Sequence, residues 1–215
     1  MNKKLKNNEK WKEEKQKIIR YARDKYFKEG FFKASMDSLA ADLRMSKKTI
    51  YKYFPGKEKL VEEVISDFMN SIKEKIDEIF CSKKDAVTKV AEFIELIGNI
   101  ISQFSENWLK DLKIHTPALW IKIDSFRTKK ITAAISGIIE QGRAEKLFLD
   151  YPAEIIVPIF VASIRTIVNP DFLLNNKFSY NQAAKICIEI LINGILTEKG
   201  KVIFYKSNRS TLWKS

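Results

Sequence analysis

The chain has 215 residues, 45% apolar and 31% charged, a composition typical of a globular protein with one large domain or two small ones. Only seven glycines and five prolines occur among abundant Lys, Glu, Ile and Leu, which favours helices over a turn-rich β fold. No apolar run reaches the roughly 18 residues of a membrane span, and residues 1–17 lack the apolar core of a secretory signal. We therefore expect a cytoplasmic, all-α protein with no membrane partner.

Positive charge is concentrated near the N-terminus. The formal net charge is +12; residues 1–60 hold 18 Lys and Arg against 8 Asp and Glu, whereas residues 61–215 hold 21 against 19. Such a basic block fits a polyanion such as DNA. A solvated Lys-rich arm, or a basic helix on a membrane surface, would carry similar charge. The pattern that follows the first helix favours DNA over the membrane.

Few residues suit metal or catalytic chemistry. One histidine and two distant cysteines, Cys81 and Cys187, cannot form the common His/Cys metal sites within one chain. Both cysteines fall in helical patterns, which favours buried thiols in a reducing compartment over a disulfide. The sequence also lacks a Gly-rich phosphate loop, a nucleophile elbow and an obvious pair of catalytic carboxylates. We expect no enzyme activity, no metal and no cofactor.

Apolar residues recur at helical spacing along the whole chain. The pattern predicts a frayed start over residues 1–10 and about nine helices. These span residues 11–29, 36–43, 47–54, 57–80, 86–108, 117–145 (one helix or a bent pair), 152–168 and 180–197. Gly30 is placed for a left-handed C-cap, and Pro158 should kink its helix or delay its start. The segment 201–215, with Val202–Tyr205 and Trp213, either docks on a dimer surface or ends as a tail.

Two short helices with a tight turn between them lie from Ser35 to Phe54. Ser35 and Ser46 are placed as N-caps, and Arg44 and Met45 form the turn. The inward positions hold Leu39, Ala40, Leu43, Met45, Ile50 and Phe54. The outward positions of the second helix hold donors for phosphates and base edges: Lys47, Lys48, Thr49, Tyr51, Lys52 and Tyr53. This is the pattern of a helix-turn-helix whose second helix enters the major groove, although a solvated face on an ordinary helical hairpin would look similar.

The stretch from Phe31 to Leu60 resembles the N-terminal DNA-binding domain of the tetracycline-repressor (TetR) family. The resemblance rests on Ser35 with Leu39-Ala40, on Ser-Lys-x-Thr-Ile-Tyr-x-Tyr-Phe over residues 46–54, and on Lys57-Glu58-x-Leu60. It covers residues 12–65 closely. Beyond them only length and helix pattern agree, including Gly142 before Lys146–Phe148.

The resemblance implies an all-α fold in two domains. Residues 1–55 would form an N-terminal arm and a three-helix helix-turn-helix domain. Residues 56–215 would form a C-terminal helical domain for ligand binding and dimerisation. In this family the last two long helices form the dimer, and a ligand changes the spacing of the two DNA-reading heads.

Two residues depart from the family pattern. Arg44 stands at the turn where the family usually has Gly, so the turn must be made by a non-Gly residue under strain, or Arg44 reaches a phosphate. Lys48 stands where Gly is frequent and adds a long donor near the bases. Both make the base preference harder to infer by analogy.

We expect DNA contacts at the following positions: Ser35, Arg44, Ser46, Lys47, Lys48, Thr49, Tyr51, Lys52, Tyr53 and Lys57. Among them, Tyr51, Tyr53 and Lys57 suit phosphates, because each carries a long side chain with a terminal donor. Ser46 suits a cap better than a base contact.

The later helices carry two further candidate sets. Aromatic and apolar residues of the middle helices suit a pocket for an unknown small effector, or an ordinary core. They are Phe93, Ile97, Ile101, Phe104, Trp108, His115, Trp120, Phe126 and Phe160. Helices that are apolar on several sides suit a homodimer interface. The candidates are Ile156, Phe160, Ile164, Ile167, Ile186, Ile190, Leu191 and Ile195.

Together these features predict a ligand-responsive repressor. It would bind double-stranded, pseudo-palindromic operator DNA as a homodimer and be released by a small apolar or amphipathic effector. A transcriptional activator of the same fold remains an alternative that the sequence does not separate. A second alternative is an architectural protein that binds DNA without operator choice and has a small specificity ratio.

Overall fold

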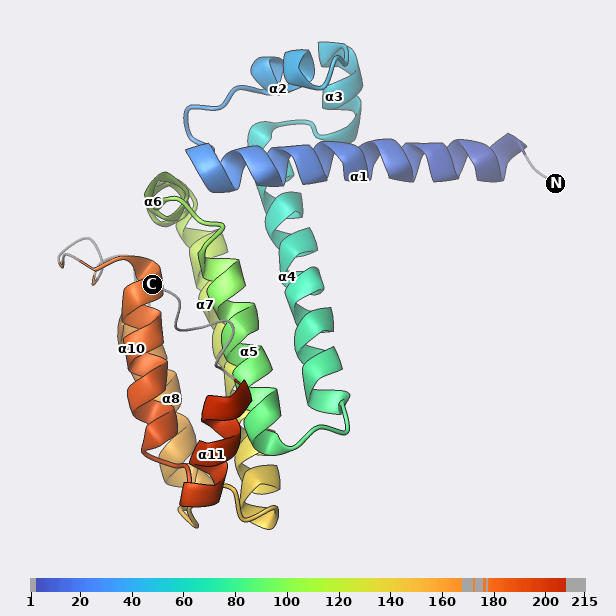
Figure 1. Cartoon of the computed structure of the whole chain (residues 1–215). Helices are drawn as coiled ribbons and strands as arrows, with labels where there is room; N and C mark the ends of the chain where they lie inside the picture. Colours follow the sequence, from blue (N-terminus) through green and yellow to red (C-terminus); the bar gives the residue numbers. More distant parts are fainter. Residues whose placement is uncertain (1–2, 168–171, 173–175, 177, 208–215) are drawn as a thin grey trace. The chain divides into compact units, whose positions relative to one another are not determined.

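The computed structural model describes residues 3–167, 172, 176 and 178–207. Within this part of the chain it contains ten helices and no named strand, which confirms the predicted all-α fold. The helices are α1 (Lys3–Glu29), α2 (Met36–Asp42), α3 (Lys47–Tyr53), α4 (Lys57–Cys81), α5 (Ala86–Ile101), α6 (Glu106–His115), α7 (Pro117–Ala144), α8 (Ala153–Ile167), α10 (Tyr180–Asn193) and α11 (Glu198–Ser207) (Figure 1).

The chain divides into two compact units. Unit 1 comprises residues 1–71 and 104–121, and unit 2 comprises residues 72–103 and 122–215. The chain therefore passes between the units within α4, before α6 and within α7. The predicted functional boundary between residues 55 and 56 stays a prediction.

Helix α1 is longer than the sequence pattern predicts. It begins at Lys3, so the expectation of a frayed segment is wrong from that residue onward. No Gly or Pro interrupts residues 3–29, and Lys, Glu and Gln in this stretch favour helix. The helix ends where predicted: Gly30 has a φ of +82° and its N–H donates to the Tyr26 carbonyl at 2.8 Å.

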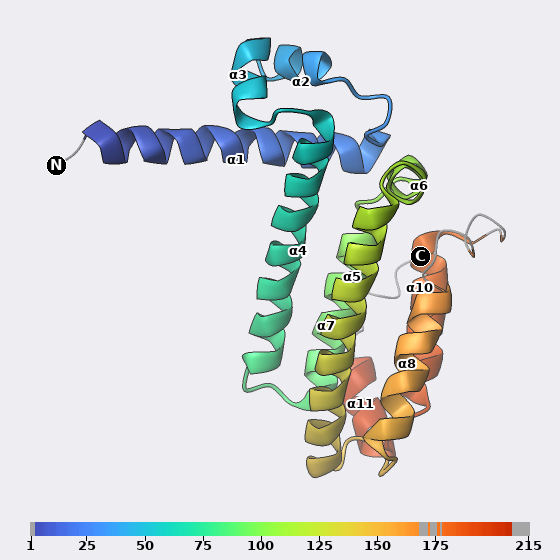
Figure 2. The same ribbon diagram turned by 180° about the vertical axis from the view of Figure 1, so that it is seen from behind.

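Unit 1 has its own apolar core, to which α1, α2, α3, the start of α4 and α6 all contribute. Ile18, Ala22, Ile50, Phe54 and Leu60 are fully buried in this unit. Figure 2 shows α2 and α3 lying together along one side of α1. Of the predicted inward residues of the helix-turn-helix, Leu39, Ala40, Leu43, Ile50 and Phe54 are buried as their spacing indicated, whereas Met45 is half-buried.

The predicted continuous helix over residues 86–108 is wrong. Helix α5 ends at Ile101, and α6 begins after Ser105, whose hydroxyl accepts the Trp108 N–H at 3.2 Å. The Ser105 N–H donates to the Phe27 carbonyl at 2.8 Å, which ties this break to the end of α1. An uninterrupted apolar pattern could not reveal a break set by such a long-range contact.

The core of unit 2 joins α5, α7, α8, α10 and α11. Val87 is fully buried, and Phe160, Ile192 and Phe204 pack in the same cluster. The links before α8 and after α10 also meet, since Phe148 and Leu196 form an isolated bridge. Helix α8 runs from Ala153 through Pro158, so the predicted late start at that proline is wrong.

The C-terminal segment is partly explained. The predicted last helix ends at Asn193 instead of Thr197, and a further helix, α11, follows. Phe204 of α11 is 2% exposed, and α11 packs on α5. This part of the segment therefore belongs to the core of the same chain, whereas Trp213 lies outside the described residues.

The two cysteines differ in burial. Cys187 is buried, as predicted, and burial raises the pKa of its thiol. Cys81 is exposed at the end of α4, so the prediction that it is buried is wrong. Both are free thiols. Among the helices described, none is long and apolar enough to cross a membrane.

Two glycines of α7 test how closely unit 2 is packed. A Cβ on Gly142 would overlap the Phe148 ring, whereas a Cβ on Gly137 would meet nothing within 4 Å. We expect Gly142→Ala to lower the free energy of unfolding by about 1–3 kcal/mol, because the ring must move. Gly137→Ala, the matched control on the same helix, should raise it by up to about 1 kcal/mol. Urea unfolding measures both; equal effects would contradict the packing at Gly142.

Candidate nucleic-acid interface

The turn between α2 and α3 depends on a left-handed residue. Arg44 has a φ of 54°, and its N–H donates to the Ala41 carbonyl at 3.0 Å, while the Met45 N–H donates to the Ala40 carbonyl at 2.9 Å. This pair of bonds is the Schellman ending of a helix, in which Gly usually takes the left-handed position. The expected non-Gly turn is therefore present, and the Arg44 side chain is exposed.

Both predicted N-caps are formed. The Ser35 hydroxyl accepts the Ser38 N–H at 3.0 Å, and the Ser46 hydroxyl accepts the Thr49 N–H at 3.0 Å. Ser46 and Thr49 also join their hydroxyls at 2.7 Å. These bonds begin α2 and α3 at fixed residues, which sets where the donors of α3 lie.

Helix α3 has one buried and one polar face. Ile50 and Phe54 are 0% exposed, which anchors the helix against the core of unit 1. The opposite face presents Lys48, Tyr51 and Lys52, all exposed, together with half-buried Thr49. Within the described residues, Lys48 and Lys52 have no ion pair, and Tyr51 keeps 47% of its surface accessible. This surface can offer ammonium and hydroxyl donors to phosphates or base edges.

Two of the predicted DNA contacts on α3 already have partners within unit 1. Lys47 forms an ion pair with Asp37 of α2 at 2.5 Å, and this hydrogen bond raises the pKa of Lys47. Tyr53 is 9% exposed, so the prediction that it points outward is wrong, and its hydroxyl donates to Glu14 of α1 at 2.6 Å. Burial and the bond to Glu14 raise the pKa of Tyr53 to about 12, so it stays a donor.

Lys57, at the start of α4, also has partners within unit 1. Its ammonium donates to the carbonyls of Phe32 and Ala34, at 2.6 and 3.0 Å, and lies 5.8 Å from the centre of the Phe32 ring. It thus closes the link between α1 and α2 from the start of α4. A phosphate contact by Lys57 stays a prediction.

Polar contacts hold α1 against the helix-turn-helix and α4. Lys25 forms an ion pair with Asp42 of α2 at 2.6 Å, which raises the pKa of Lys25 and lowers that of Asp42. Gln16 donates to Asp67 of α4 at 2.7 Å, and Lys15 reaches Glu63 at 3.2 Å. The spacing of apolar residues carried no signal for these contacts.

Helix α6 contacts the link before the helix-turn-helix, which the sequence pattern did not predict. One Asp111 carboxylate oxygen accepts the N–H groups of Phe31 and Phe32, both at 2.7 Å. A Cβ at Gly30 would approach this oxygen to 2.6 Å, so Gly30 is needed for space as well as for its φ. His115 stacks on the Phe32 ring, with 3.6 Å between ring centres.

The predicted pocket residues fall into both units. Phe104 and Trp108 lie in unit 1, in an aromatic cluster around Phe27, with ring centres 4.9 and 4.7 Å from it. His115 and Trp120 also belong to unit 1, and His115 is exposed. Phe93, Ile97, Phe126 and Phe160 belong to unit 2, where all but Phe126 join its core cluster. The side chain of Ile101 lies outside the described part.

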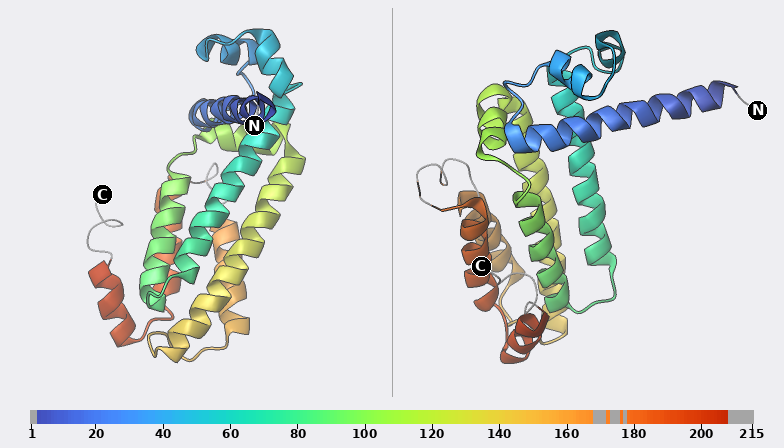
Figure 3. Two further views of the ribbon diagram at one scale, coloured as in Figure 1. Left: turned by 90° about the vertical axis from the view of Figure 1, so that its right-hand side faces the viewer. Right: turned by 45° about the horizontal axis from the view of Figure 1, so that its top comes forward.

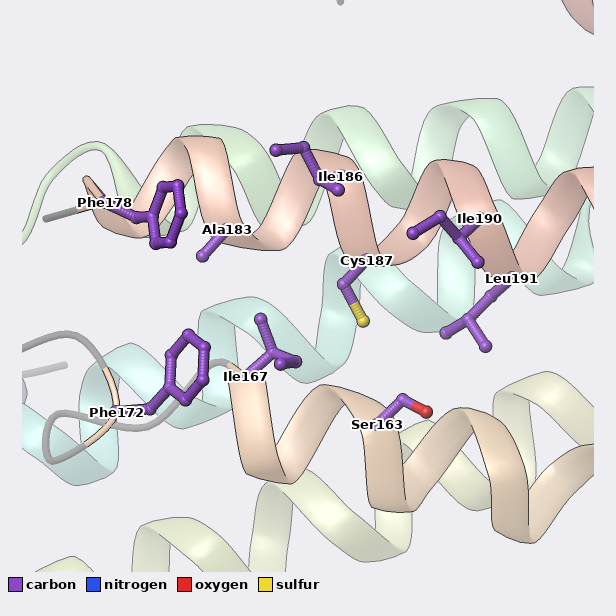
Figure 4. A pocket seen from close by; sticks show the side chains of 9 residues that line it. All are labelled: Ser163, Ile167, Phe172, Phe178, Ala183, Ile186, Cys187, Ile190 and Leu191. Atoms are coloured by element: carbon purple, nitrogen blue, oxygen red, sulfur yellow. The ribbon is translucent and has the colours of Figure 1, made fainter. Parts of the chain in front are cut away.

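An apolar groove of about 300 Å³ lies along α8 and α10 of unit 2. Figure 4 shows Cys187 and Leu191 of α10 pointing toward α8, with Phe172 and Phe178 at one end. The lining residues are Ser163, Ile167, Phe172, Phe178, Ala183, Ile186, Cys187, Ile190 and Leu191. None of them is a predicted pocket residue, and the three isoleucines and the leucine among them belong instead to the predicted dimer set.

The predicted dimer residues divide by exposure. Ile156, Phe160 and Ile195 are buried in the core of unit 2, and Ile164 and Leu191 pack partly buried against it. Ile186 and Ile190 are 50% and 67% exposed, and Ile167 is half-buried at the groove. On α8 the exposed isoleucines are Ile155 and Ile159, each one position before a predicted residue. One position rotates a side chain by about 100° around a helix, which is enough to change its face.

The geometry of α2 and α3 defines a class of protein. Two short helices, capped by serines and joined by a left-handed turn, hold a polar face of the second helix outward, as a DNA-binding helix-turn-helix requires. Residues 18–64 match the model of the family described as bacterial regulatory proteins, tetR family.

Similar proteins agree with this class. The chain is 24% identical over 169 residues to YvaF, an HTH-type transcriptional regulator of Bacillus subtilis, covering 78% of this chain and 88% of that protein. A transcriptional regulator of Cytophaga hutchinsonii matches with a TM-score of 0.65 and 25% identity, over 85% of this chain and 98% of its own. A putative transcriptional regulator of Saccharomonospora viridis, solved in complex with choline, matches with a TM-score of 0.67 and 16% identity. The match covers 87% of this chain and 100% of that chain.

Residues 18–64 are thus similar to the DNA-binding domain of the tetR family, and over most of its length the chain is similar to known transcriptional regulators. The resemblance seen in residues 31–60 is thereby confirmed.

Substitution of Arg44 tests two separate expectations: that its left-handed backbone is strained, and that its side chain contacts DNA. We expect Arg44→Gly to raise the free energy of unfolding by roughly 1 kcal/mol, because Gly adopts the left-handed region without steric cost. If Arg44 also contacts a phosphate, the dependence of log K on log salt should become less steep by about 0.9. Urea unfolding and DNA titrations at several salt concentrations separate the two effects. Lower stability in the Gly variant would contradict the strain.

Proposed function

We propose that this regulator is a repressor that binds a pseudo-palindromic operator as a homodimer and is released by a small apolar or amphipathic effector. The observation that carries the DNA part is the outward face of α3. There Lys48, Tyr51 and Lys52 stay exposed while Ile50 and Phe54 are fully buried. A buried anchor with outward donors is what base reading by a recognition helix needs.

Dimerisation is supported by unpartnered apolar surface on two neighbouring helices. Ile155 and Ile159 of α8 are 57% and 48% exposed, and Ile186 and Ile190 of α10 are 50% and 67% exposed. Helices α8 and α10 pack against each other, so their exposed faces can form a continuous patch. Burial of such a patch against a second copy removes apolar area from water and would present two α3 helices to two half-sites.

An effector is supported by the chemistry of unit 2 and by a structural neighbour. The groove along α8 and α10 is almost entirely apolar, and Ser163 and Cys187 are its polar side chains. Ile186 and Ile190 line this groove and also belong to the proposed dimer surface, so an effector there would lie beside the interface. The Saccharomonospora viridis regulator is described in complex with choline, so a protein of this fold can hold a small organic molecule. We infer that effector binding changes the DNA-binding domain through α6, because Asp111 and His115 of that helix contact the link before α2.

Selection of bound duplexes from a random library, with and without candidate ligands, tests this function. Enrichment of a two-fold symmetric sequence, abolished on adding an apolar ligand, is the expected result. Binding without any enriched sequence would favour an architectural protein instead. Transcription assays on the selected operator then distinguish repression from activation.

Lys48 tests base reading directly. We expect Lys48→Ala to weaken binding of the selected operator about 5- to 150-fold, corresponding to about 1–3 kcal/mol, and to relax preference at one position of each half-site. Lys28→Ala, on exposed surface of α1, is the matched control for charge. Competition titrations against single-base variants of the operator measure both. An equal loss for both variants on all sequences would argue against a base contact by Lys48.

Ile190 tests the dimer. We expect Ile190→Glu to yield a monomer at micromolar concentration, because a carboxylate would be buried unpaired at the interface. Ile121→Glu is the matched control, since Ile121 has the same 67% exposure and lies on α7 in unit 1. Light scattering after size-exclusion chromatography reports the mass. A wild-type monomer, or a dimeric Ile190→Glu variant, would contradict this interface.

A further inference from the structure

The first turns of α1 form a basic helical segment outside the part of the chain that the family model matches. We define the basic arm as residues 3–12, which hold Lys3, Lys4, Lys6, Lys10 and Lys12 against a single acid, Glu9. The family match begins only at residue 18, so the arm precedes it. The arm is nevertheless part of the same continuous helix as the core residues of α1.

The C-terminal end of the arm packs against α3, the proposed recognition helix. Trp11 packs on the Tyr53 ring of α3, with 5.1 Å between ring centres. One turn later Glu14 accepts the Tyr53 hydroxyl at 2.6 Å, and the Lys15 ammonium lies 5.7 Å from the centre of the Phe54 ring. The right-hand view of Figure 3 shows α1 continuing past α3 and α4 toward its N-terminus.

The C-terminal half of the arm is exposed to solvent. Residues 8–13 are all exposed, and the length from Lys3 to Lys10 corresponds to about 12 Å of helix. Apolar residues in the arm are only Leu5 and Trp11, and Trp11 is already packed on Tyr53. The arm therefore lacks the apolar face that a membrane surface or a hydrophobic protein groove requires.

The charge of the arm favours an anionic partner. Its first turn contains Lys residues and no acid, so cations lie at the positive end of the helix dipole. Lys6 and Lys10 repeat the same charge four residues apart, which destabilises an isolated helix. Phosphates bound along the arm would offset both the unfavourable helix dipole and the repulsion between the lysines. DNA bound by α3 would place a phosphate backbone near Trp11, where the arm meets α3.

We propose that the basic arm binds the phosphate backbone of operator DNA beyond the base pairs read by α3. This inference rests on the proposed function, because the arm meets DNA only if α3 does. The contacts are to phosphates, so they add affinity and footprint length without adding sequence preference.

The test compares the full-length wild type with a variant carrying Lys3→Gln, Lys4→Gln, Lys6→Gln and Lys10→Gln, since Gln keeps helix propensity and removes charge. The control variant carries Lys73→Gln, Lys75→Gln, Lys83→Gln and Lys199→Gln, which removes the same charge from exposed positions of unit 2. Each is titrated over a range of salt on two duplexes. One holds only the selected operator, and the other adds about eight base pairs on each side.

On the long duplex, the arm variant should show a less steep dependence of log K on log salt, by about 0.9 for each phosphate that the arm no longer binds. On the short duplex the difference from wild type should shrink, and the control variant should match wild type on both. Changing the flanking sequence should have no effect. Matching circular dichroism spectra and thermal midpoints show that the variants fold.

An arm variant that matches the control variant on the long duplex would overturn the proposal. So would an unchanged DNA titration accompanied by weaker binding to vesicles containing phosphatidylserine, which would assign the arm to a membrane. Failure of the proposed function has a different signature: wild type would then bind neither duplex with operator preference.

Discussion

The burial of Ile50 and Phe54 sets the rotation of α3 about its own axis. With both side chains at 0% exposure, the helix has one orientation in unit 1, and this orientation leaves Lys48, Tyr51 and Lys52 exposed on its outer face. The turn at Arg44 and the cap at Ser46 then set where α3 starts. The exposed donors of this seven-residue helix have defined directions because its buried face is fixed by packing in the core of unit 1.

Several acidic residues of unit 1 are engaged in internal contacts. Asp42 pairs with Lys25, Glu63 with Lys15, and Glu14 accepts Tyr53, each joining two helices. These pairs are exposed or half-buried, so each contributes little stability by itself. They also affect the surface field, since carboxylates held in these contacts do not offset the charge of Lys48 and Lys52 on the outer face of α3.

The position of α6 ties the helix-turn-helix to residues more than 70 positions further along the chain. Asp111 binds two backbone N–H groups in the link between α1 and α2, and the Ser105 N–H bonds to the end of α1. The aromatic cluster of Phe27, Phe104 and Trp108 covers the same junction. A movement of α6 relative to α1 would therefore disturb hydrogen bonds just before the helix-turn-helix.

By itself the sequence determined the features that depend on neighbours within a few residues. These include the serine caps, the left-handed Gly30, the forced turn at Arg44, and the two faces of α3 except at Tyr53, which was predicted outward and is buried. The same local logic identified the family from residues 31–60, because a helix-turn-helix is specified by short-range spacing. For the same reason, the proposed DNA contacts on α3 could be predicted from spacing and residue type alone.

Only the tertiary structure decided the features that depend on distant partners. It separated buried Ile156 from exposed Ile155 on α8, because the orientation of a helix that is apolar all round depends on what packs against it. It ended α5 at Ile101 and brought α6 to the end of α1, through a bond between Ser105 and Phe27. It also placed Phe204 in a core, since the burial of an apolar tail depends on a surface formed by other helices.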